Sequence, residues 1–289
     1  RQRQMCIRDS VKGGQLVTTT IGSILKQTRK AQKLTQKTVA TGICSQAMLS
    51  AIEHDKYIPN VALTLALCRR LGLSLETLSL AENYAISQTA DLNAKLDRLC
   101  NAHEYEALLA FLQSPTTSAA IATAAQTEAY YYYLSIAEYQ THHQSALMHI
   151  QLALAQHSAG TPLTVLDRLS FATKAVIEAT AGQKKAADRD FSTAFEELET
   201  TAYAPNLNSL FYLHAYTAYK AGDYLACANQ LQAGIDFATA HGSHYMLAND
   251  YYLLASAAQK LKNADTQREA SQRAAIFKEL FGDTIFHDF

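Results

Sequence analysis

Residues 34–59 read LTQKTVATGICSQAMLSAIEHDKYIP, and this stretch decides the fold of the amino-terminal part of the chain. Thr35 stands where the N-cap of a short helix is expected, and Val39 and Ala40 fall on the inner face of that helix. Gly42 can adopt the positive φ angle that closes a turn between two helices. The stretch therefore predicts two short helices that meet at a tight turn.

Helical signals continue on both sides of this turn. Ser45 is a second N-cap, and apolar residues three positions apart anchor the helix that it opens. The flanking sequence adds one helix before the turn and two after it. Asn60 opens the fourth helix and Gly72 ends it, while Ser74 opens the fifth. We therefore expect a compact five-helix domain over residues 21–80.

The two halves of the chain carry opposite charges, although the net charge of the whole is −1. Residues 21–80 contain eight Lys and Arg against three Asp and Glu, whereas residues 81–289 contain 13 against 22. A small basic domain joined to a larger acidic one is typical of a nucleic-acid reader with a regulatory partner. A chance asymmetry of surface charge is the alternative explanation.

The amino-terminal pattern resembles a known class of DNA-binding domains. It is similar to the helix-turn-helix of the XRE/Cro repressor class at Leu34-Thr35-Gln36, Val39-Ala40, Gly42, Leu49-Ser50, Ile52-Glu53 and Pro59. The segment ICSQAMLSAIE, residues 43–53, resembles more narrowly the Rgg/PlcR/PrgX group of peptide-sensing regulators.

This resemblance implies that the second and third helices place side chains against double-stranded DNA. Gln36 would bond a backbone phosphate at the start of its helix, and Gln46 would read adenine through a paired amide contact. Lys56 and Tyr57 would reach phosphate from the loop after the third helix. The expected DNA-binding residues are Gln36, Ser45, Gln46, Ala47, Ser50, Ala51, Lys56 and Tyr57.

Two features depart from the family pattern. Asp55 stands where Gly is common, although Asp tolerates the left-handed conformation of such a turn. Ala47 and Ala51 can touch only thymine methyl groups, so we expect specificity to depend also on dimer spacing and DNA shape. A helical bundle that uses this pattern only for packing or protein contact is the alternative.

From about residue 84 onward the sequence reads as successive helices, in which small and large residues recur with a period of roughly 40. The copies are Ala187-Phe191-Ala194 after Gly182, Cys227-Leu231-Gly234 after Gly222, Ala146-Ile150-Ala153, Ala107-Phe111 and a looser Ala270-Ala274-Phe277. We predict an all-α protein with a right-handed α-solenoid of about five degenerate hairpins that resemble tetratricopeptide repeats. A plain helical bundle is the alternative.

The first helices of these hairpins are rich in Tyr and should line the inner surface of the solenoid. Two faces carry Asn beside Tyr, one formed by Asn208, Tyr212 and Tyr216 and the next by Tyr245, Asn249 and Tyr252. An Asn side chain can pair with both main-chain groups of an extended peptide, and Tyr adds stacking area with a polar tip. We therefore expect these six residues to bind a short signalling peptide, the ligand that the resemblance implies. Tyr that merely fills wide gaps between helices would show the same pattern.

The sequence contains no pattern that indicates catalysis, a cofactor or a metal. It has no Gly-rich phosphate loop and no nucleophile elbow, and its paired histidines lack a carboxylate or Cys at ligand spacing. Its five cysteines are scattered and fit reduced thiols, and no run reaches the roughly 18 apolar residues of a membrane span. We expect a cytoplasmic protein that is not an enzyme.

Residues 1–20 fit neither half, and RQRQMCIRD at their start resembles the translation of sequencing-adapter DNA. We expect a disordered, non-native leader there, followed by the domain at 21–80, a hinge at 81–90 and the repeat domain at 91–289.

Together these features predict a homodimeric transcriptional regulator that reads a DNA operator under the control of a short peptide. One alternative is a helical-repeat interaction scaffold with a weak or vestigial DNA-binding domain. A ligand-free repressor of phage type is a third possibility, but it assigns no role to the repeat domain.

Overall fold

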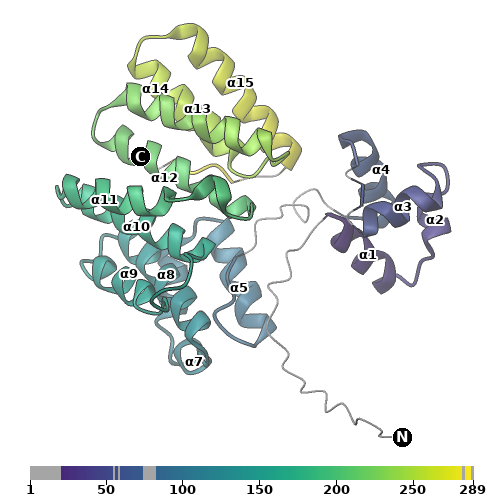
Figure 1. Cartoon of the computed structure of the whole chain (residues 1–289), viewed down its shortest axis with the longest axis horizontal. Helices are drawn as coiled ribbons and strands as arrows, with labels where there is room; N and C mark the ends of the chain where they lie inside the picture. Colours follow the sequence, from purple (N-terminus) through teal and green to yellow (C-terminus); the bar gives the residue numbers. More distant parts are fainter. Residues whose placement is uncertain (1–20, 55, 58, 74–82, 282–283, 288–289) are drawn as a thin grey trace, which may run out of the picture. The chain divides into compact units, whose positions relative to one another are not determined.

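The computed structural model describes the whole chain except residues 1–20, 55, 58, 74–82, 282–283 and 288–289. The chain divides into two compact units between residues 72 and 73 (Figure 1). Each unit has its own buried core. No strand occurs in the part of the chain that the structure describes. The predicted leader, the Asp55 turn, the fifth helix from Ser74 and the start of the predicted hinge lie outside the described residues.

The described part of the first unit holds four helices: α1 (Ile21–Ala31), α2 (Gln36–Ala40), α3 (Gln46–Glu53) and α4 (Val61–Leu71). They enclose a small apolar core whose fully buried members are Leu25, Val39, Ala40, Leu49, Ile52, Leu67, Cys68 and Leu71. These are the inward positions of the helical pattern, so hydrophobic burial sets the register of each helix.

The predicted ends of α2, α3 and α4 are confirmed. The side chains of Thr35, Ser45 and Asn60 accept hydrogen bonds from the main-chain N–H three residues later, at 3.1, 3.1 and 2.9 Å. Gly42 and Gly72 adopt φ angles of 76° and 65°. Capping residues and left-handed glycines therefore define where α2, α3 and α4 begin or end.

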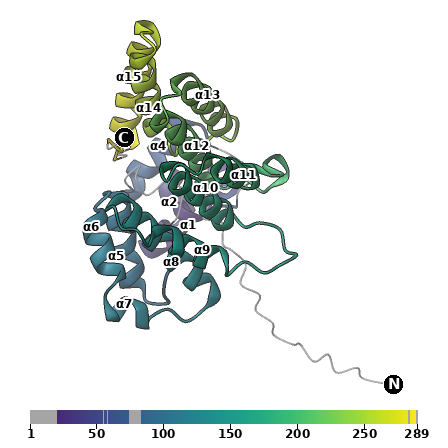
Figure 2. The same cartoon turned by 90° about the vertical axis from the view of Figure 1, so that its left-hand side faces the viewer.

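The second unit is a stack of helical hairpins, as predicted. Among the described residues, five hairpins pair consecutive helices: α5 (Ala90–Asn101) with α6 (Tyr105–Leu112), α8 (Ala124–Gln140) with α9 (Ala146–Leu154), α10 (Val165–Thr180) with α11 (Lys184–Phe195), α12 (Asn208–Lys220) with α13 (Tyr224–Ala240), and α14 (Leu247–Lys260) with α15 (Ala264–Phe281). Figures 1 and 2 show them following one another in chain order from α5 to α15. A short α7 (Pro115–Ala119) and two 3₁₀ turns, η2 (Leu198–Thr200) and η3 (Pro205–Leu207), occupy the connections.

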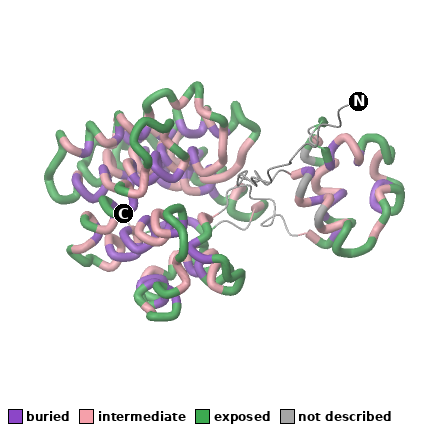
Figure 3. Tube along the Cα trace, turned by 60° about the horizontal axis from the view of Figure 1, so that its bottom comes forward, coloured by how far each residue is buried: buried purple, intermediate pink, exposed green. Residues whose placement is uncertain are grey.

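Buried residues lie where neighbouring helices of this unit face one another, and the connecting turns are exposed (Figure 3). Small residues of the repeat pattern occupy the close contacts. A Cβ atom added at Gly234 of α13 would lie 2.7 Å from the Cβ of Phe211 on α12. Glycine is therefore the residue that lets these two helices approach.

One predicted repeat position is wrong. Ala107 on α6 is exposed, whereas Leu108 and Leu112, also four positions apart, are buried at 1% and 0% exposure. The other predicted position, Phe111, is buried at 6% exposure, so the inward face of α6 includes Leu108 and Phe111 but not Ala107.

The described residues before α5 belong to the second unit. The main-chain N–H of Tyr84 donates to the hydroxyl of Tyr133 at 2.7 Å, and that of Ile86 donates to the side-chain oxygen of Asn93 at 3.1 Å. Ile86 is fully buried. This part of the predicted hinge at 81–90 is therefore packed against the repeat helices. None of the described helices has the length and apolar character needed to cross a membrane.

Candidate functional site

The third helix presents the residues predicted to read DNA on its outer face. Gln46 and Ala47 are exposed, and Ser50 and Ala51 are half-buried one turn later. Leu49 and Ile52, on the opposite face, are buried in the core of the unit. α3 is therefore held by its apolar side and leaves a narrow stripe of small polar and apolar side chains available to a partner.

The remaining predicted DNA contacts lie around this stripe. Ser45 is exposed and uses its hydroxyl oxygen as the N-cap of α3. Its O–H hydrogen stays available to donate to an anion. Lys56 and Tyr57 follow α3 and are exposed, Tyr57 to 43%.

Gln36 has a structural partner that the sequence pattern did not reveal. Its side-chain nitrogen donates to Oε2 of Glu53 at 2.8 Å. The same carboxylate accepts two hydrogen bonds from Arg29 of α1, at 2.6 and 2.8 Å. Since a primary amide has two N–H groups, Gln36 retains one that can donate to a phosphate.

Burial and hydrogen bonding act in opposite directions on Glu53. Burial raises the pKa of this carboxyl, but the hydrogen bonds from Arg29 and Gln36 outweigh that effect, so the pKa lies below its ordinary value. Glu53 is thus ionised and links α1, α2 and α3.

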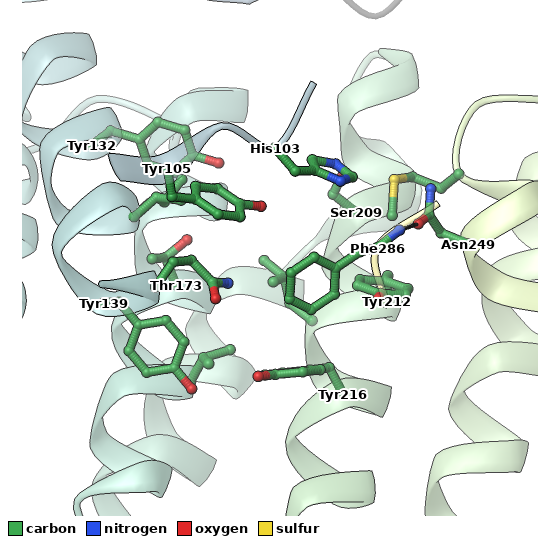
Figure 4. Close-up of a pocket in the computed structure, with 15 residues that line it drawn as sticks. His103, Tyr105, Tyr132, Tyr139, Thr173, Ser209, Tyr212, Tyr216, Asn249 and Phe286 are labelled. Atoms are coloured by element: carbon green, nitrogen blue, oxygen red, sulfur yellow. Dashed lines mark hydrogen bonds between the residues drawn. The ribbon is translucent and has the colours of Figure 1, made fainter. Parts of the chain in front are cut away.

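The second unit contains a cavity of about 200 Å³ among the first helices of its hairpins (Figure 4). Residues of α8, α10, α12 and α14 line it, together with the turn between α5 and α6, the start of α6 and the segment after α15. The first helices of the last four hairpins therefore line the cavity as expected, whereas the first hairpin contributes its turn and the start of α6 instead of α5. The lining residues are His103, Tyr105, Tyr132, Ile136, Tyr139, Gln140, Thr173, Val176, Ser209, Tyr212, Leu213, Tyr216, Met246, Asn249 and Phe286.

Aromatic residues form opposite sides of this cavity. Tyr105, Tyr132 and Tyr139 lie on one side, and Tyr212 and Tyr216 lie on the other (Figure 4). None of the lining residues is Asp, Glu, Lys or Arg. The cavity therefore suits a neutral, largely apolar group that can also form a few hydrogen bonds.

Three of the six predicted peptide-binding residues line the cavity. They are Tyr212, Tyr216 and Asn249. Tyr212 and Tyr216 are also almost fully buried, at 7% and 5% exposure, and their rings stack with centroids 6.5 Å apart. Burial and the nearby Asp250 raise the pKa of the Tyr212 phenol, so Tyr212 stays neutral.

The other three predicted residues lie outside the lining. Asn208 is fully buried, and its side-chain nitrogen donates to the carbonyl oxygen of Tyr245 at 2.9 Å. Asn208 therefore fixes the turn before α14 and is not placed to meet a ligand. Tyr252 packs edge-on against His287, with ring centroids 4.7 Å apart.

Several lining residues were not predicted from the sequence. His103 and Tyr105 come from the first hairpin, Thr173 from α10 and Phe286 from the segment after α15. Tyr132 belongs to the Tyr-rich run at residues 130–133, so its helix could be anticipated but its inward direction could not.

The amino-terminal unit has a recognised family pattern. Residues 25–78 match the family model described as Helix-turn-helix. This part of the chain is a helix-turn-helix domain. The match spans most of the predicted domain at 21–80, and the predicted resemblance is confirmed there.

Most of the chain is similar in fold to a solved structure. It matches Bacillus thuringiensis PlcR in complex with the peptide PapR7 and DNA, with a TM-score of 0.56, 18% identity and coverage of 91% of this chain and 95% of that chain. The apo form of PlcR matches with a TM-score of 0.54, 16% identity and coverage of 91% and 94%. At this level of identity the likeness shows a shared fold. Among curated proteins the chain has no match.

Proposed function

We propose that this protein is a homodimeric transcriptional regulator that binds a specific DNA operator and is controlled by a short signalling peptide bound in its repeat domain. The observation that carries the proposal is the presence, in one chain, of a helix-turn-helix domain and an aromatic cavity on the inner helices of a repeat unit. PlcR, whose fold is similar, has been solved in complex with a peptide and DNA.

The first unit supplies the DNA-binding part of this proposal. α3 would enter the major groove, with Gln46 bonding an adenine edge and Ala47 and Ala51 against thymine methyl groups. Exposed basic residues of this unit, Lys30, Lys33, Lys37, Lys56 and Arg69, would meet the phosphates. Two copies in a dimer would read two half-sites and add the specificity that the short α3 stripe lacks.

The second unit supplies the peptide-sensing part. Asn249 would bond the peptide main chain, and Tyr212 and Tyr216 would offer aromatic surface to its side chains. A peptide that binds more tightly to one arrangement of the dimer would shift the population towards that arrangement and change DNA affinity. In this proposal the protein is not an enzyme.

The scaffold alternative rests on α3, since Ala47 and Ala51 leave few hydrogen-bonding groups on its outer face. Fluorescence anisotropy with the DNA that flanks the protein's own gene distinguishes the regulator from the scaffold. We expect tight binding that weakens steeply between 50 and 200 mM salt, as counterion release requires, and that shifts when short peptides from the host's culture medium are added. DNA binding that does not change when peptide is added would contradict the peptide-sensing role. The absence of specific DNA binding would favour the scaffold.

A further inference from the structure

The described residues after α15 return to the cavity of the second unit. In this carboxy-terminal segment, residues 284–287, Thr284 and His287 are exposed while Ile285 and Phe286 are buried at 6% and 7% exposure. Figure 4 shows the Phe286 side chain between the two aromatic sides of the cavity. The segment is therefore held by two buried apolar side chains, of which Phe286 enters the cavity, and is bordered by two exposed ones.

The main chain of this segment is bonded by a residue predicted to bind a peptide. The side-chain oxygen of Asn249 accepts a hydrogen bond from the main-chain N–H of Phe286 at 2.9 Å. Such a contact reads only the backbone, so any peptide residue other than proline can make it. Asn249 thus already forms, with the chain's own tail, the bond expected for a ligand.

The Phe286 ring fits an aromatic box formed by residues far apart in the chain. Its centroid lies 5.8 Å from the ring of His103, 6.4 Å from Tyr105 and 6.2 Å from Tyr216, at interplanar angles of 83°, 77° and 68°. These are edge-to-face contacts, the geometry that aromatic pairs prefer. The box therefore suits an aromatic side chain of this size.

From these contacts we propose that the carboxy-terminal segment occupies the peptide site of the second unit. The ligand is then a short peptide whose aromatic residue replaces Phe286 in the box while its main-chain N–H replaces that of Phe286 on Asn249. This proposal rests on the proposed function and names the chemistry of its ligand.

The attachment of the segment to the chain determines how strongly it competes. A tethered group binds with an effective concentration near the millimolar range, so a peptide that makes only the same contacts displaces it poorly. The apparent affinity equals the intrinsic affinity multiplied by the fraction of molecules in which the site is vacant. Weakening the contacts of the carboxy-terminal segment should therefore strengthen peptide binding. Damage to a binding site has the opposite effect.

The test uses full-length protein and a fluorescein-labelled peptide with the sequence of residues 284–287, Thr-Ile-Phe-His, blocked at its carboxyl end. Phe286→Ala empties the box, and Thr284→Ala, at an exposed position of the same segment, is the matched control. We expect the probe to bind Phe286→Ala at least tenfold more tightly than it binds the wild type or Thr284→Ala. Adding Asn249→Ala to Phe286→Ala should reduce that affinity, and a probe with Ala in place of Phe should lose it.

Equal probe affinity for the wild type and Phe286→Ala, in variants with matching circular dichroism, would overturn the proposal. If Phe286→Ala does not fold, hydrogen exchange of residues 284–287 in the wild type replaces this comparison. Protection that falls when excess unlabelled probe is added supports displacement, and unchanged protection at saturation contradicts it. If the probe binds more tightly to Phe286→Ala but the protein binds no DNA, the proposed regulator is refuted and the occupied site is supported. If DNA binding responds to peptide but Phe286→Ala does not bind the probe more tightly, the regulator is supported and the occupied site is refuted.

Discussion

Arg29 and Glu53 are joined by two hydrogen bonds, from Nε to Oε1 at 2.6 Å and from Nη2 to Oε2 at 2.8 Å. The Glu53 side chain is 0% exposed and that of Arg29 is 11% exposed. A third nitrogen of Arg29 donates to the carbonyl oxygen of Leu34 at 3.0 Å. Arg29 therefore fastens the end of α3 and the loop before α2 to α1, and the exposed stripe of α3 depends on this cluster for its position.

Replacing Arg29 by Ala should destabilise the helix-turn-helix domain strongly. The change leaves the Glu53 carboxylate buried without its charged partner, and removing one partner of a buried pair costs about 3–5 kcal/mol. Hydrogen exchange measured by mass spectrometry should show large losses of protection in α2 and α3 and little change in α8 to α15. Lys30→Ala, at an exposed neighbouring position, should leave the exchange pattern unchanged, and equal protection in both variants would contradict the role given to the pair.

Replacing Gln46 by Ala should weaken specific DNA binding without changing thermal stability. A paired amide contact to adenine is worth about 1–3 kcal/mol, which corresponds to a loss of roughly 5- to 150-fold in affinity. Gln46 is exposed, so its removal opens no cavity. Anisotropy on the operator and on unrelated DNA measures the effect, with Gln259→Ala on the exposed end of α14 as the control. Undiminished operator affinity would assign the reading role to another residue.

The sequence was most informative where structure depends on near neighbours. The caps at Thr35, Ser45 and Asn60 and the helices that they open could be predicted, because capping and helical periodicity act within a few residues. The link between Gln36 and Glu53 could not be, because it depends on how separate helices pack.

The same limit explains the outcome at the cavity. Spacing along α12 and α14 correctly placed Tyr212 and Tyr216 on one face and Asn249 on the inner side. Spacing does not show how deeply each side chain is buried. Asn208 shares the face of Tyr212, yet it lies at the first turn of α12 and is fully buried there, bonded to the turn before α14. The position of Phe286 results from tertiary packing, so no local pattern could reveal it.

Replacing Gly234 by Ala should destabilise the second unit. The added methyl group would meet the Cβ of Phe211 at 2.7 Å, and that atom cannot move away without shifting α12. Overpacking of this kind costs about 1–3 kcal/mol. The free energy of unfolding in urea measures the loss, with Ala233→Ser at the exposed neighbouring position as the control. A variant as stable as the wild type would show that α12 and α13 can separate at little cost.

Replacing Glu128 by Gln should change how stability depends on pH. Burial, and then the charge of Asp167, raise the pKa of Glu128 to about 7, although His157 opposes them. In the described part of the chain, Oε1 of Glu128 is buried and has no hydrogen-bond partner. The folded protein therefore favours the protonated form of this carboxyl more than the unfolded chain does.

The sign of the effect follows from this difference. The stabilising contribution of protonated Glu128 is complete below the unfolded pKa of about 4.3 and is lost as pH rises through about 7. Glu128→Gln has no such loss, so we expect its Tm to approach that of the wild type near pH 4 and to exceed it at pH 8. Solvent reduces the effect because Glu128 is only half-buried, so the expected gain at pH 8 is about 2–4 °C, the shift that 1 kcal/mol produces in a domain of this size.

Thermal unfolding followed by circular dichroism between pH 4 and pH 8 measures this difference, with Glu106→Gln at an exposed position of α6 as the matched control. Because Tm values at each pH are compared between variants, the titration of groups that do not interact with Glu128 cancels. Wild-type and Glu128→Gln profiles that stay parallel over the whole range would show that Glu128 is ionised in the folded protein. The environment beside Asp167 and His157 would then be polar enough to hold the ionised Glu128 carboxylate.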